Sequence, residues 1–157
     1  MAEVFHEVAM DAYLFARFLH VLFAAIWLSQ NATSVRVAKV LAQTNLEALP
    51  STSVKAVPVI GALAGVLTLT TGVWLVSLTG GWESAPVAIH IGATLALVLL
   101  VIGAWPIGMG WRKVFKASEQ IGENNLRSAL ALNIARWSHV SMGIWGVILA
   151  TMVFRHL

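Results

Sequence analysis

Residues 86–107 read PVAIHIGATLALVLLVIGAWPI and contain no Asp, Glu, Lys or Arg. A helix needs about 20 mostly apolar residues to cross the hydrocarbon core of a bilayer, so this stretch is long enough to span a membrane. Three further apolar stretches lie on either side of it in the chain. We therefore predict membrane-spanning helices over about residues 12–29, 57–78, 86–107 and 130–154.

The composition of the chain agrees with a membrane protein. Its 157 residues are 59% hydrophobic and 11% charged, whereas soluble domains usually carry about 25% charged residues. Four spans with short connections nearly fill the chain, which predicts one transmembrane domain over residues 1–157. The predicted fold is therefore an all-α integral membrane four-helix bundle in contact with the lipid bilayer.

Charge and cysteine content exclude several other classes of protein. The net charge is +3, but the basic residues form no patch interleaved with aromatic side chains, so we expect no nucleic-acid binding. The chain has no cysteine, which excludes disulfides, thiolate metal sites and covalently attached c-type haem. No phosphate-binding glycine loop or hydrolase triad is present either.

The distribution of Lys and Arg predicts the orientation in the membrane. The second connection carries Glu83 and no basic residue, whereas basic residues gather in the first and third connections. By the positive-inside rule those two connections are cytoplasmic, and both termini lie on the outer, periplasmic side of a bacterial cytoplasmic (inner) membrane. We also expect residues 35–40 to continue the first helix beyond the membrane, and Pro106 to end or kink the third.

Ionisable side chains inside a span are costly, so each is a candidate for function. The predicted spans contain five: Arg17, His20, His90, Arg136 and His139.

Two predicted helices place small residues and an aromatic or basic side chain on the same face as an imidazole. On residues 12–29 this face holds Arg17, His20, Ala24 and Trp27, and on residues 130–154 it holds Arg136, His139, Gly143, Gly146 and Ala150. The span 57–78 has a similar stripe of Gly61, Gly65, Thr68 and Gly72. Such stripes serve close helix packing, or they leave room for a flat cofactor. Both interpretations stay open from the sequence.

A haem b held by two neutral imidazoles needs one histidine from each of two helices at similar depth. His20 lies near the middle of its predicted span, and His139 lies about four residues, roughly 6 Å, to the cytoplasmic side of the middle of its own. These two form the preferred ligand pair, with His90 in reserve, also as a partner of His20. Arg17 and Arg136 are candidate partners for the haem propionates, and the alternative is that both extend to the lipid headgroups.

Two other functions use the same residues. Copper accepts imidazole and thioether ligands, and His139 adjoins Met142 on one helix face, so a copper-binding or copper-transfer protein is an alternative. The third hypothesis is a cofactor-free accessory subunit of a membrane complex, in which the histidines only form hydrogen bonds within the bundle.

Residues 18–27, FLHVLFAAIW, resemble the opening helix of a loose group of bacterial membrane proteins. This group includes the copper-resistance D family, the HemJ-type protoporphyrinogen oxidases and four-helix relatives. Residues 71–75, TGVWL, and the position of His139 are also similar. The resemblance implies haem b binding or copper handling, and it transfers the ligand role to His20 and His139.

Together these observations predict a membrane haem b protein for electron transfer or redox chemistry. If the protein is an enzyme, we expect a haem-dependent membrane oxidoreductase. Quinone or a redox partner subunit is the expected partner, and the sequence is also compatible with a homo-oligomer.

Overall fold

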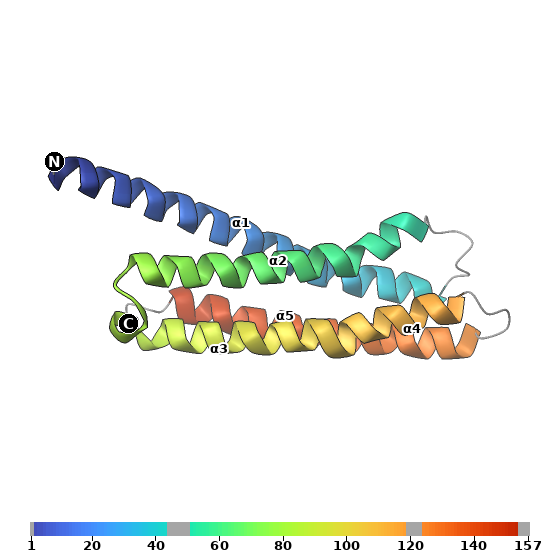
Figure 1. The fold of residues 1–157 in the computed structure, drawn as a ribbon. Helices are drawn as coiled ribbons and strands as arrows, with labels where there is room; N and C mark the ends of the chain where they lie inside the picture. The colour runs from blue at the N-terminus through green and yellow to red at the C-terminus, as the bar shows by residue number, and fades with distance from the viewer. Residues whose placement is uncertain (1, 44–50, 119–123, 154–157) are drawn as a thin grey trace.

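The computed structural model describes residues 2–43, 51–118 and 124–153, and these are almost entirely helical. The all-α class predicted from the sequence is therefore confirmed. The elements in chain order are α1 (Ala2–Gln43), α2 (Ser51–Leu78), the short 3-10 helix η2 (Trp82–Ser84), α3 (Val87–Ile102), the π-helical turn η3 (Gly103–Ile107), α4 (Gly108–Ser118) and α5 (Asn124–Val153). The helices lie side by side in an elongated bundle, and the N-terminal part of α1 leans away from the others (Figure 1).

Three segments among the described residues are long and apolar enough to cross a membrane: Met10–Gln43, Val54–Leu78 and Val87–Ala117. Large apolar side chains cover the outside of these helices, with Phe18, Leu63 and Val101 each about 60% exposed. A surface of this kind is suited to lipid and not to water. The chain is accordingly a membrane protein with an all-helical bundle.

The described helices are longer than the predicted spans. The expected extension of the first helix over residues 35–40 is confirmed, because α1 continues to Gln43. Pro106 does not end the third helix, which passes through the π-helical turn η3 and continues directly into α4. A wider π turn removes the clash between a proline ring and the carbonyl four residues earlier, so the helix continues where an α-helical turn would break.

α1 and α5 run antiparallel, and three contacts fix their register. The rings of Trp27 and Trp145 meet edge to face, with centroids 5.3 Å apart. Next to them, Ser141 Oγ lies 3.2 Å from Asn31 Oδ1. Further along, the Ser128 hydroxyl donates to the carbonyl of Ala42 over 3.1 Å. One alignment of the two helices satisfies all three contacts.

α2 receives large side chains of α1 along its stripe of small residues. A Cβ added at Gly61 would lie 3.5 Å from Gln30 Cβ, and one at Gly65 would lie 3.0 Å from the indole of Trp27. The stripe continues to Gly72, which faces the ring of His20. Close helix packing is therefore the use of this stripe, and α1 occupies the space that a flat cofactor would need.

α5 also packs antiparallel against the continuous helix formed by α3, η3 and α4. The methyl carbon of Met152 lies 3.9 Å from the position of a Cβ on Gly92. Nearer the other end, the side chain of Ile134 lies 2.8 Å from the position of a Cβ on Gly110. These two contacts define the register between the two helices.

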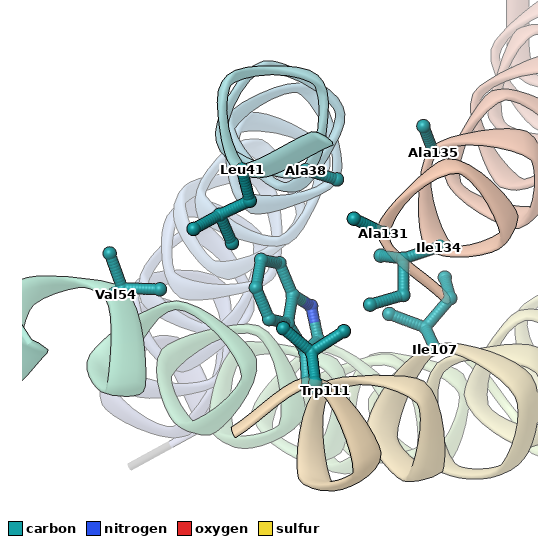
Figure 2. Close-up of a cluster of buried hydrophobic side chains, with 9 residues drawn as sticks. Ala38, Leu41, Val54, Ile107, Trp111, Ala131, Ile134 and Ala135 are labelled. Atoms are coloured by element: carbon teal, nitrogen blue, oxygen red, sulfur yellow. The ribbon is translucent and has the colours of Figure 1, made fainter. Parts of the chain in front are cut away.

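Buried apolar side chains form two clusters. We call the end of the bundle near the α2–α3 turn the outer end and the opposite end the inner end. At the inner end, the fully buried indole of Trp111 lies among side chains of α1, α2 and α5 (Figure 2). The second cluster lies around the Trp27–Trp145 contact and comprises Trp27, Ala64, Leu99, Trp145 and Ile148. In the described part of the chain, both clusters lie inward of His20.

The glycine at position 65 is predicted to be essential for packing. Trp27 is 5% exposed and is held against Trp145, so its indole has little freedom to move away from a larger side chain at that position. We expect Gly65→Leu to lower the free energy of unfolding by about 3 kcal/mol, at the upper end of the usual cost of overpacking. Thermal unfolding of the detergent-purified protein measures the change.

Gly143→Leu is the matched control, because a Cβ at Gly143 meets no described atom within 4 Å. This control should unfold at the temperature of the unsubstituted protein or above it, since leucine also has the higher helix propensity. Equal unfolding temperatures for the two variants would contradict the packing described for α1 and α2.

Candidate functional site

His20 lies on α1 with its imidazole turned toward α2. The Nδ1 atom lies 2.9 Å from the backbone carbonyl oxygen of Thr68 and 3.2 Å from Thr71 Oγ1. A carbonyl oxygen only accepts hydrogen bonds, so Nδ1 carries the proton and donates it. The Thr71 hydroxyl itself donates to the carbonyl of Leu67 over 2.7 Å, so it too accepts from Nδ1. In the neutral form of His20 the proton therefore lies on Nδ1.

This tautomer leaves Nε2 with its lone pair. No described residue forms a hydrogen bond with Nε2. Ligating histidines in metalloproteins are usually oriented in this way, with the second ring nitrogen donating to a carbonyl or carboxylate. The geometry at His20 thus fixes the orientation of the ring and leaves one ring nitrogen without a described hydrogen-bond partner.

The local sequence of α2 explains why the ring fits there. A Cβ at Gly72 would lie 3.1 Å from Cε1 of His20, so the imidazole packs directly on the backbone. The Thr68 hydroxyl donates to the carbonyl of Ala64 over 2.7 Å, as the Thr71 hydroxyl does to that of Leu67. Both hydroxyls therefore donate within α2. The carbonyl of Thr68 and a lone pair of the Thr71 hydroxyl remain to accept from the imidazole.

His139 lies far from His20 along the bundle. In the α1–α5 register, His20 is level with Met152 and His139 is level with Thr33. Positions 139 and 152 are separated by thirteen residues of α5, or roughly 20 Å along the helix axis. His139 is also exposed on the outside of the bundle. The predicted pair of His20 and His139 is thus not brought together within one chain, and the expectation of similar depth has to be corrected.

The error in depth arises from polar residues that lie inside the bundle. The polar stretch after Ser29 suggests that the first span ends there, but α1 continues with Asn31 and Ser34 8% and 5% exposed. Their partners in the register are Ser141 and Ser138 of α5, which are also buried. The packed part of α1 therefore extends further inward than its hydropathy indicates, which places His20 nearer the outer end.

The other predicted site residues on α5 face away from the described helices. Arg136 is exposed near the inner end. Gly143 and Gly146 are exposed, and a Cβ at either would meet no described atom within 4 Å. This face of α5 therefore neither packs against another described helix nor faces His20.

The remaining predicted residues lie nearer to His20. Arg17 is exposed on α1, three residues outward of His20. His90 is exposed on α3 with its ring centroid 5.7 Å from that of Trp82. Because Gly92 is level with Met152 and His20, His90 differs from His20 in depth by only about 3 Å. Trp27 is buried in the cluster inward of His20 and stabilises the helix packing.

The contacts of His20 on α2 were missed by the sequence reasoning, although a signal was present. Thr68, Thr71 and Gly72 lie on one side of a helix and offer a carbonyl, a hydroxyl and open space within a single turn. Among the described residues no group of three or more His, Asp and Glu side chains could hold a metal ion without a further ligand source.

Comparison with known proteins places the chain in no group. No protein-family model matches it, and no curated protein or solved structure shows a significant match.

The tautomer of His20 is directly measurable. In protein labelled with 15N-histidine, the His20 signals should show a protonated Nδ1 and an unprotonated Nε2, because the Thr68 carbonyl can bond only to a protonated nitrogen. Comparison with a His20→Gln sample assigns these signals to His20. The ring-nitrogen signals of the exposed His139 serve as the internal reference. A protonated Nε2 on His20 in cofactor-free protein would contradict the assigned geometry.

Proposed function

We propose that this chain is a membrane protein that binds haem b near the outer end of its bundle, with Nε2 of His20 as an axial ligand. The observation that carries the proposal is the hydrogen bond from Nδ1 to the Thr68 carbonyl, which orients the ring and leaves Nε2 unprotonated. When bound, the haem supplies the redox chemistry, and the protein supplies ligation and orientation.

The packing of the bundle supports this location. The two buried apolar clusters occupy the inner end and the middle of the described bundle, where Trp111, Trp27 and Trp145 fill the interior. At the level of His20 the neighbouring positions on α2 and α3 are Gly72 and Gly92. Toward its N-terminus α1 leans away from the other helices, so the described bundle is less filled by large buried side chains at this level than in its inner half (Figure 1).

Arg17 is the residue we assign to the propionates. It lies one turn outward of His20 and is exposed, so its guanidinium is available to a half-buried carboxylate at the outer surface. Arg136 lies near the inner end, level with Arg36 of α1, and is too far from His20 for this role. We assign Arg136 to the lipid headgroups, which a long basic side chain reaches from a span end.

The proposed topology has four spans, with α5 as the fourth. α5 runs beside α1 and α3 from Ser128 to Met152, a stretch as long as the apolar segment Val54–Leu78, which has 25 residues. The exposed basic residues of α4, Arg112, Lys113 and Lys116, lie at the inner end. The positive-inside rule then makes the inner end cytoplasmic, and both termini lie on the periplasmic side of a bacterial cytoplasmic membrane.

In this proposal the protein passes single electrons to or from a quinone or a redox partner subunit. His20 ligates and Arg17 neutralises the propionates, while Gly72 keeps space for the imidazole. Two histidine substitutions separate the haem function from copper binding and from a cofactor-free accessory role.

The test uses protein purified from cells supplied with both haem and copper. We expect a Soret band that sharpens into reduced haem b bands on reduction, and His20→Ala should bind haem at least tenfold more weakly. His139→Ala is the matched control and should retain its haem, because His139 is exposed and lies roughly 20 Å further inward than His20. Added imidazole should restore haem binding to His20→Gly by replacing the missing ligand.

Three results would count against the proposal. Full haem content in His20→Ala would exclude His20 as a ligand. A colourless protein that contains copper would favour the copper hypothesis. A protein without haem or copper, whose histidine variants change only assembly, would favour the accessory subunit.

A further inference from the structure

The facing surfaces of α1 and α5 can be followed outward from their known contact. Trp27 meets Trp145, and seven residues along an α-helix return to the same face within about 20°. Seven residues outward from Trp27 is His20, and seven residues outward from Trp145 is Met152. His20 and Met152 therefore lie at the same level of the bundle, on the helix faces that carry Trp27 and Trp145.

The side chain of Met152 lies at the junction of α5 with α3. Its methyl carbon is 3.9 Å from the Cβ position of Gly92, and the residue is 50% exposed. The absence of a side chain at Gly92 leaves the thioether space next to α3. Methionine has three rotatable bonds and a polarisable sulfur, so the sulfur is free to adjust toward a metal between α1 and α5.

His90 is at a similar depth but faces in another direction. Gly92 is buried and points toward α5, and a residue two positions away lies roughly 160° around the helix. His90 is accordingly exposed and contacts Trp82. Met152, on the face of α5 that carries Trp145, is therefore the second ligand candidate at this level, and the imidazole of His90 is not.

We propose that the sulfur of Met152 is the second axial ligand of the haem that His20 binds. This inference rests on the proposed function, since it concerns the same site. Ligation by histidine and methionine raises the reduction potential of a haem above that of ligation by two histidines. The site would therefore favour accepting electrons from its partner.

The test is Met152→Leu, an apolar replacement of similar volume. We expect this variant to keep haem through His20, to lose the six-coordinate low-spin spectrum, and to show a lower reduction potential in a redox titration. Met142→Leu is the matched control, because Met142 is an exposed methionine on the same helix, ten residues further inward. It should keep both the spectrum and the potential of the unsubstituted protein.

The outcomes distinguish this inference from the haem proposal itself. If Met152→Leu keeps the low-spin spectrum and the potential while His20→Ala loses haem, Met152 is not a ligand but the haem site stands. If the unsubstituted protein binds no haem through His20, both proposals fail together.

A second measurement does not depend on a folded variant. The ferric unsubstituted protein should show the near-infrared charge-transfer absorption of a thioether bound to iron. A low-spin ferric protein that lacks this absorption would overturn the assignment of Met152.

Discussion

The arrangement of the bundle depends on the contact between the large side chains of α1 and the glycines of α2. Gly61 and Gly65 bring the two backbones close together, and the indole of Trp27 lies directly on Gly65. In a membrane, where lipid is as apolar as the side chains, such close packing is a main source of helix association. The same stripe ends at Gly72, where the imidazole of His20 takes the place of an apolar side chain. Helix packing and the orientation of His20 thus have one structural cause.

The helices of the bundle were easier to predict from the sequence than the alignment of one helix against another along the bundle axis. Continuous apolar runs predicted the all-helical class and the three described segments that are long enough to cross a membrane, because crossing a bilayer needs about 20 mostly apolar residues. Depth was harder to predict, since hydropathy treats Asn31 and Ser34 as loop residues. In the structure these side chains are buried against α5, where Ser141 bonds to Asn31. Hydropathy cannot distinguish a polar residue in a loop from one with a partner on the next helix.

The candidate site was predictable in part for the same reason. His20 stands out as an ionisable residue in an apolar run, but its partner atoms are a backbone carbonyl and a hydroxyl on α2, and these carry no signal in hydropathy. His139 looks equivalent in sequence because it also shares a face with glycines. Only the register shows that its face is turned outward, where Gly143 and Gly146 have no described neighbour. The role of a stripe of small residues can therefore be assigned only when the helices that pack against it are known.

The two ends of the bundle have different physical characters, and this difference bears on function. At the inner end Trp111, Leu41 and Ile134 are fully buried and fix four helices in one packed cluster. At the level of His20 the imidazole lies on Gly72 and Met152 lies against Gly92, and α1 diverges toward its N-terminus (Figure 1). Close-packed interiors resist rearrangement. The inner cluster can thus hold the register of α1 against α5, and this register determines which side chain lies opposite His20.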